Sequence, residues 1–113
     1  GTEAEICAGI RYLKHLDSQF VEQVKDSSDR IMFVLASFNI GPGHVEDAMR
    51  LANSYKKDAS SWKDVSFYIS NLSNPKYYND TAVKHGYFPG IYSVDFANSI
   101  VNRYKHYLNV IPQ

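Results

Sequence analysis

The stretch 29-DRIMFVLASFNIGPG-43 decides the fold, because an apolar run ends there in Asn-Ile-Gly-Pro-Gly. Residues 31–38 of this run do not alternate with polar residues, as those of a half-buried strand would. Apolar side chains on every side of a helix are typical of a central helix that others surround. The stretch therefore predicts a core helix over about residues 29–39, followed by a turn.

Other segments on both sides of this helix show apolar residues at steps of three and four, preceded by N-cap residues or Pro. They predict helices at about residues 2–16, 44–55, 61–71, 74–84 and 93–108, with a short helical piece around residues 20–24. No segment alternates with period two for long enough to form a convincing strand. We therefore expect an all-α chain of about six helices, with residues 1–113 forming one domain.

Charge and cysteine content narrow the partners and the compartment. Lys and Arg number 12, as do Asp and Glu, so nothing in the net charge favours nucleic acid or an anionic membrane surface as a partner. The single Cys7 excludes an internal disulfide and a cysteine-based zinc site, and it fits either a reducing cytosol or an envelope protein without disulfides. No transmembrane or signal-peptide pattern is present.

The titratable residues do not form a recognisable catalytic or metal-binding motif. The histidines lack the H-x-x-x-H spacing of a zinc site, so we expect no metal and no cofactor. Glu46 and Asp47 lie in the first turn of a predicted helix, where solvated carboxylates interact favourably with the helix dipole. No carboxyl lies in an apolar run that would raise its pKa, so no catalytic residue is predicted.

Two loops that contain Gly and Pro remain as candidates for a binding site. Asn39 can offer an amide donor and an acceptor, and the Gly41-Pro42-Gly43 turn leaves backbone open for a ligand to approach. The second loop, 84-KHGYFPG-90, contains Tyr87, whose ring could stack on a ligand. The alternative is an ordinary helix-loop-helix corner, with Asn39 bonded to local backbone.

Four segments resemble, in order, motifs of soluble lytic transglycosylase (SLT) domains, in particular those of the membrane-bound lytic murein transglycosylase F type. The segment 36-ASFNIGPGHVEDAMRLA-52 is similar to the family's A-[AS]-Y-N-x-G-x-G-x-V-x-D-A-x-x-L-A stretch. The others are 8-AGIRYLKHL-16, 84-KHGYFPG-90 and 94-VDFANSIVNRYKHY-107, which resemble the A-G-x-x-Y-L helix, the Y-G-Y-x-R-G loop and the closing helix. The resemblance thus covers nearly the whole chain.

This resemblance implies a lysozyme-like α-fold and an activity on peptidoglycan. The family cleaves the β-1,4 bond between N-acetylmuramic acid and N-acetylglucosamine to give a 1,6-anhydro product, using one Glu as acid and base and no metal. That Glu belongs to an E-S-x-F-x-P motif, followed by G-L-M-Q, and neither motif occurs in this sequence. We therefore expect the C-terminal portion of such a domain, without the catalytic Glu and inactive by itself.

The resemblance also implies which residues contact the substrate. Those carried over are Phe38, where the family usually has Tyr, together with Asn39, Gly41 and Tyr87. Pro89 stands where the family usually has Arg. The implied partner is a peptidoglycan glycan strand, in the periplasm or cell envelope.

Two other interpretations stay open beside this one. The chain could be a noncatalytic glycan-binding or protein-interaction module on the same helical scaffold, or an unrelated helical domain. If an N-terminal half is missing, the apolar faces that it would cover exceed what a typical monomer exposes. We then expect self-association or a partner chain on those faces.

Overall fold

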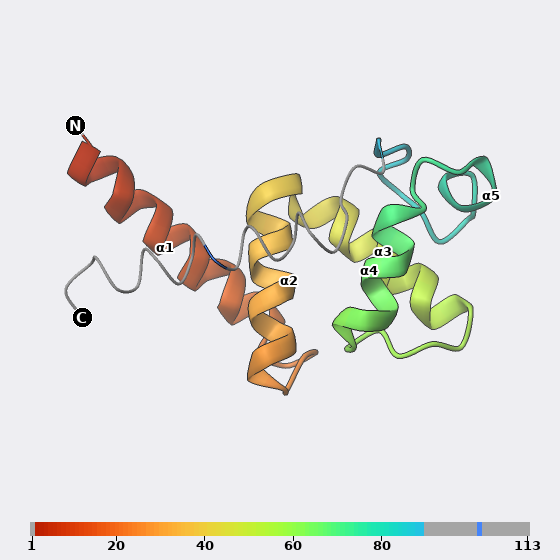
Figure 1. Cartoon of the computed structure of the whole chain (residues 1–113), viewed down its shortest axis with the longest axis horizontal. Coiled ribbons are helices and arrows are strands. Elements are labelled where there is room, and N and C mark those ends of the chain that lie inside the picture. The colour runs from red at the N-terminus through yellow and green to blue at the C-terminus, as the bar shows by residue number, and fades with distance from the viewer. Residues whose placement is uncertain (1, 90–101, 103–113) are drawn as a thin grey trace.

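A computed structural model describes residues 2–89 and 102, and all regular secondary structure in that part of the chain is helical (Figure 1). Its labelled elements are α1 (Thr2–Phe20), α2 (Ser27–Ile40), α3 (Pro42–Ser54), α4 (Trp62–Ser70) and α5 (Pro75–Tyr78). The predicted all-α class is confirmed, and the arrangement agrees with the lysozyme-like class. The helix predicted at 93–108 lies outside the described residues.

α1 is one continuous helix, whereas the sequence predicted an end near residue 16 and a separate short piece. Leu16 and Phe20 are both buried and lie one helical turn apart on the same stripe, so the helix continues to present an apolar face to α2. Val24, fully buried in the following turn, donates its N–H to the Phe20 carbonyl at 2.8 Å. Figure 1 shows the N-terminal half of α1 extending away from the other labelled helices.

α2 forms the centre of the described helices and packs against α1, α3 and α4. The side chain of Asp26 accepts a hydrogen bond from the Asp29 N–H and caps its start, as the polar break before it predicted. Residues 33–37 are buried, and the Phe33 ring contacts those of Phe20 and Trp62, with centroids 5.8 and 5.5 Å apart. The predicted core helix is confirmed.

One side of α2 differs from the prediction of an entirely surrounded helix. Ile31 and Phe38, two turns apart on the same face, remain 40% and 48% exposed. The ring of Tyr12 in α1 contacts Phe38 but leaves both rings partly exposed. We call these partly exposed residues the α1–α2 aromatic face (Tyr12, Ile31 and Phe38).

α3 and α4 pack against each other and close the core on the side opposite α1. The buried residues of α3 include Val45, Ala48 and Leu51, and those of α4 include Val65 and Ile69. The Ser61 side chain accepts from the Asp64 N–H and caps α4, as predicted, although at 3.4 Å this bond is long. None of the described helices has the length and apolar character needed to cross a membrane.

α5 is a single turn, although the sequence predicted a helix over 74–84. Asn74 and Pro75 form its N-cap and first position as expected. The chain then leaves the helix because the Asp80 side chain accepts from the Ala82 N–H in a local turn. Residues 80–88 run back along α3 as a loop, which we call the return loop (residues 80–88).

Candidate functional site

The corner between α2 and α3 depends on one glycine. Gly41 has φ 93° and ψ 143°, a backbone conformation that residues with a Cβ rarely adopt. Its N–H donates to the Ser37 carbonyl at 2.9 Å. Pro42 then opens α3 with a φ already suited to a helix. Gly41 thus ends one helix and sets the direction of the next.

Gly43 is explained by a contact inside the chain. A Cβ at Gly43 would lie 3.0 Å from ring atoms of His85 in the return loop. Beside it, the rings of His44 and Phe88 contact each other, with centroids 5.0 Å apart. His85 therefore occupies the space that a side chain at Gly43 would need, which explains the glycine without a ligand.

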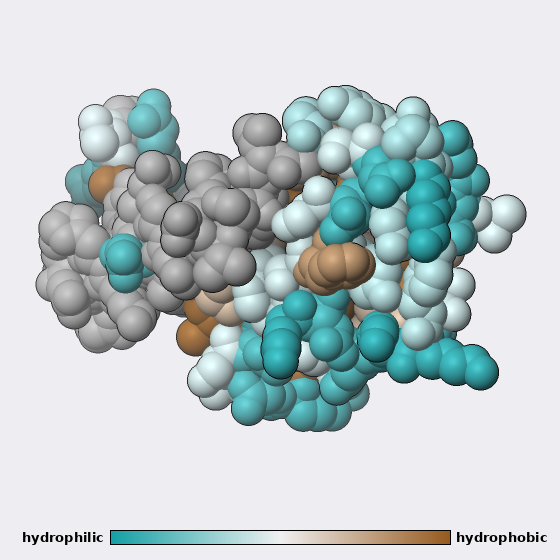
Figure 2. Space-filling view, turned by 45° about the vertical axis from the view of Figure 1, so that its right-hand side comes forward, coloured by the Kyte–Doolittle hydropathy of each residue, from teal (hydrophilic) through white to brown (hydrophobic). Residues whose placement is uncertain are grey.

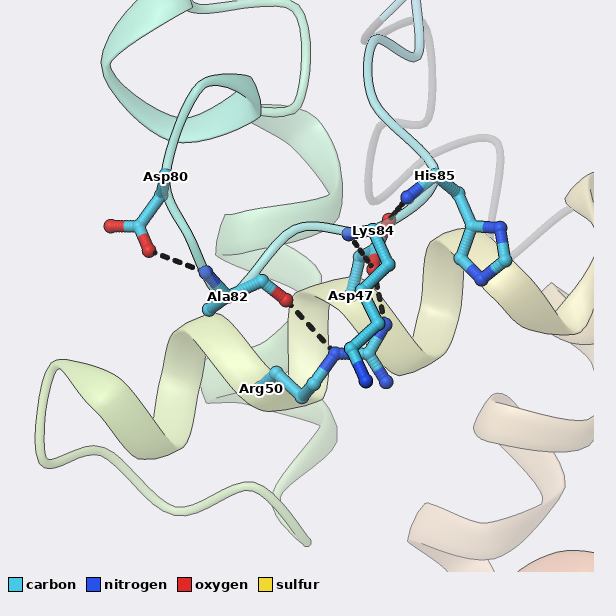
Figure 3. A network of polar contacts seen from close by, with 6 residues as sticks. All are labelled: Asp47, Arg50, Asp80, Ala82, Lys84 and His85. Atoms are coloured by element: carbon cyan, nitrogen blue, oxygen red, sulfur yellow. Dashed lines mark hydrogen bonds and ion pairs between the residues drawn. The ribbon is translucent and has the colours of Figure 1, made fainter.

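Asp47 joins the corner to the return loop. Its side chain is fully buried, and its two oxygens accept hydrogen bonds from two consecutive backbone amides, the Lys84 N–H at 2.8 Å and the His85 N–H at 2.9 Å (Figure 3). A buried carboxylate is stable only when donors satisfy it, and a third donor comes from the guanidinium of Arg50. The carboxylate is therefore a fixed acceptor inside the protein.

Arg50 extends this network along the loop. Its Nη2 donates to Asp47 and its Nε donates to the Ala82 carbonyl at 2.9 Å, so one guanidinium connects α3 with the loop (Figure 3). The interpretation of Asp47 as a solvated carboxylate at a helix start is wrong. Leu51, one turn further on and also fully buried, is the signal in the sequence that widens the apolar stripe of α3 to include Asp47.

The four predicted substrate contacts lie on these elements. Phe38, Asn39 and Gly41 stand at the end of α2, whereas Tyr87 is in the return loop. Asn39 is exposed and its side chain bonds no other described residue, so the alternative in which it caps local backbone gains no support. Tyr87 is 58% exposed, and its ring meets the edge of Tyr78.

The return loop is anchored on both sides of Tyr87. Before it, Lys84 and His85 donate to Asp47. After it, the Phe88 N–H donates to the Leu72 carbonyl at 3.2 Å, and the Phe88 ring lies against His44. Tyr87, itself largely exposed, thus lies between loop residues that are hydrogen-bonded to the helical core.

Several other tyrosines have a packing role, which the sequence left open. Tyr68 in α4 is buried and lies among the rings of Tyr55, Phe67 and Tyr77, with centroids 5.1 to 5.8 Å away. Burial raises the pKa of Tyr68, because the charged phenolate is disfavoured away from water, and the neighbouring tyrosines act in the same direction. This cluster fastens the α4–α5 end of the molecule.

Among residues 2–89 and 102, no group of three or more His, Cys, Asp or Glu side chains is placed to hold a metal ion. Two buried polar atoms at the corner, Ser37 Oγ and His44 Nδ1, have no hydrogen-bond partner among the described residues.

Comparison with known proteins confirms the resemblance seen in the motifs. The chain is 42% identical over 102 residues to the membrane-bound lytic murein transglycosylase F of Shewanella denitrificans, an alignment that covers 90% of this chain and 20% of that protein. It is 39% identical over 100 residues to the protein of the same name from Saccharophagus degradans, covering 88% and 19%. For the Desulfosudis oleivorans protein of that name the identity is 36% over 102 residues, covering 90% and 22%.

The chain thus spans about a fifth of the length of the curated relatives that it matches. No protein-family model matches it. The similarity nevertheless extends over most of this chain, at identities that indicate common ancestry with that segment of the transglycosylases.

Proposed function

We propose that this chain is the C-terminal portion of a peptidoglycan lytic transglycosylase domain and supplies one wall of its glycan-binding cleft. The observation that carries the proposal is the connection between two of the motif segments, residues 36–52 and 84–90, which lie far apart in the sequence. Asp47, inside the first segment, accepts from the amides of Lys84 and His85, inside the second. Both segments that resemble the family's motifs are therefore parts of one structural unit.

The exposed groups of this unit suit a sugar. Asn39 offers both a donor and an acceptor, which match the acetamido and hydroxyl groups of N-acetylated sugars. Tyr87 offers a largely exposed aromatic side chain with a hydroxyl. Phe38 would add apolar contact at the same helix end, without the hydroxyl that the family's usual Tyr carries.

The proposed cleavage of the bond between N-acetylmuramic acid and N-acetylglucosamine belongs to the intact parent protein. In this chain Asp47 is no substitute for the catalytic Glu, because its side chain is fully buried and both of its oxygens already accept from protein donors. We predict that the isolated 113-residue chain releases no 1,6-anhydromuropeptides from murein sacculi. Turnover above a boiled control would show that another carboxylate serves as the acid.

A site of action in the cell envelope follows from this proposal, since peptidoglycan lies there. The α1–α2 aromatic face supports a second part of it, namely that another segment or chain covers Tyr12, Ile31 and Phe38. The described part of the surface drawn in Figure 2 is mostly hydrophilic, with apolar residues in small separate patches. Sedimentation of the isolated chain tests this part: concentration-dependent association supports a covered face, and a monomer at all concentrations contradicts self-association.

A titration with chitotetraose, followed by amide chemical shifts, tests glycan binding. We expect the amide shifts of Asn39 and Tyr87 to change and to saturate as chitotetraose is added. In Asn39→Ala the shift of Tyr87 should no longer saturate. Asn53→Ala is the matched control, because Asn53 is also an exposed asparagine, near the other end of α3. Unchanged shifts throughout would remove the glycan proposal and favour the alternative, a protein-interaction module on the same scaffold.

A further inference from the structure

We propose that Asp47 is a positioning residue for the glycan site: it holds the return loop so that Tyr87 is preorganised for the sugar. This inference rests on the proposed function, and it adds a residue that does not itself touch the substrate. Its basis is a side chain with no exposed surface whose oxygens accept from two consecutive loop amides. Tyr87 follows the second of these amides by two residues.

The chemistry of the contact explains why a carboxylate is needed. Two neighbouring N–H groups, those of Lys84 and His85, require two acceptor atoms at hydrogen-bond distance, and Asp47 supplies one oxygen to each. Arg50 adds a charged donor to the same carboxylate and fixes the Ala82 carbonyl on the near side of the loop. Three of the four backbone positions from 82 to 85 are therefore tied to α3 (Figure 3).

This arrangement affects binding through entropy. A free loop would lose backbone conformational entropy for each residue that it orders on binding, whereas an anchored loop has already lost that freedom. The bond from Phe88 to the Leu72 carbonyl anchors the far side. Loosening the near side alone therefore frees Tyr87 while the helices stay packed.

A second Asp–Arg pair provides the control. Arg30 Nε donates to Asp17 Oδ1 at 2.9 Å, and its Nη1 donates to the Val24 carbonyl at 3.1 Å. This pair also joins a carboxylate, a guanidinium and a backbone carbonyl, but it connects α1 with α2 and has no contact with the return loop. Asp17→Asn thus repeats the chemical change of Asp47→Asn at a different place.

The test compares chitotetraose affinity in the wild-type chain, Asp47→Asn and Asp17→Asn at a temperature where circular dichroism shows each to be folded. In Asp47→Asn an amide group replaces one acceptor oxygen and presents a donor to a backbone N–H, so the loop should detach. We expect at least tenfold weaker binding, with the Tyr87 amide shift in the free protein moving toward its unstructured value. Asp17→Asn should bind as the wild type does.

Equal affinity of Asp47→Asn and the wild type overturns the inference. If Asp47→Asn does not fold, Arg50→Gln decides instead: it removes both the guanidinium that donates to the Asp47 carboxylate and the bond to the Ala82 carbonyl, so the carboxylate no longer holds the loop as firmly. We expect about threefold weaker binding, and unchanged affinity overturns the inference. If the wild type itself does not bind, the proposed function fails and the positioning role fails with it. Wild-type binding with an unaffected Asp47→Asn refutes the positioning role alone.

Discussion

The two Asp–Arg pairs of this molecule have nearly the same chemistry and very different settings. Asp47 is fully buried under the return loop, whereas the side chain of Asp17, between α1 and α2, is 50% exposed. Asp47 binds backbone amides of a segment far along the chain, and Asp17 is bonded to the side chain of Arg30. The first pair shapes a loop, while the second joins two helices that also share a packed core.

The difference shows where polar groups determine structure in this chain. Around α1 and α2 the apolar contacts of Leu16, Phe20 and Phe33 would persist without the ion pair. The return loop has few buried side chains of its own, so hydrogen bonds to α3 hold much of it in place.

Asp47→Ala should have the largest effect. It leaves two backbone N–H groups and a partly buried guanidinium without their acceptor, which costs about 3 kcal/mol of unfolding free energy. Urea denaturation followed by circular dichroism measures the loss. A change below about 1 kcal/mol, within the range of surface ion pairs, would show that water replaces the carboxylate. The Asp47 and Asp17 pairs would then contribute similarly to stability.

Gly41→Ala should come next, with a loss of about 2 kcal/mol, because an alanine at φ 93° is strained whatever space surrounds it. Gly9→Ala is the control in the other region: Gly9 lies inside α1 with no atom near the added Cβ, so the substitution should stabilise by about 0.5 to 1 kcal/mol. Thermal melts of the two variants should thus shift in opposite directions. Equal shifts would contradict the assigned corner geometry.

Asp17→Asn should destabilise by about 0.5 kcal/mol, because its half-exposed pair is screened by water and salt. The effect should shrink further between 0.05 and 0.5 M NaCl, concentrations chosen to span about a threefold change in screening length. The effect of Asp47→Ala should persist in the same salt range. If the loss of unfolding free energy in Asp17→Asn does not change with salt, the Asp17–Arg30 pair is shielded from solvent as the Asp47–Arg50 pair is.

Phe38→Tyr should have the smallest effect on stability, within about 0.5 kcal/mol, since the ring is 48% exposed and the added hydroxyl can reach solvent. It restores the residue that the family usually has at this position. A loss above about 1 kcal/mol in denaturant titration would mean that Phe38 is covered in solution. Such a result would support association through the α1–α2 aromatic face.

Local signals in the sequence were enough to predict most of the helices. The caps at Ser61 and Asn74 act within three residues of their own position, and the structure confirms both. The cap expected in the polar stretch 25–29 is Asp26, and α2 begins at Ser27, about two residues earlier than predicted. The same local signals predicted two helical pieces, at residues 2–16 and 20–24, where the structure has the single helix α1. Phe20 continues the apolar stripe of Leu16 and keeps the helix intact.

Long-range contacts could not be predicted in this way. The partners of Asp47 are backbone amides 37 and 38 residues later, and every residue other than proline has such an amide. The helix predicted over 74–84 ends early at the local turn in which the Asp80 side chain accepts from the Ala82 N–H, and further along the amides of Lys84 and His85 bond to Asp47. The family resemblance identified the two loops in the sequence. Only the structure shows that the Asp47 carboxylate joins them.

Amide hydrogen exchange at Lys84 and His85 reports whether Asp47 holds the return loop against α3. Both residues are exposed, so without the carboxylate their amides would exchange at the rate of an open chain. We predict protection of at least a hundredfold in the wild type, lost in Asp47→Asn and kept in Asp17→Asn. Open-chain exchange at both amides in the wild type would contradict the account.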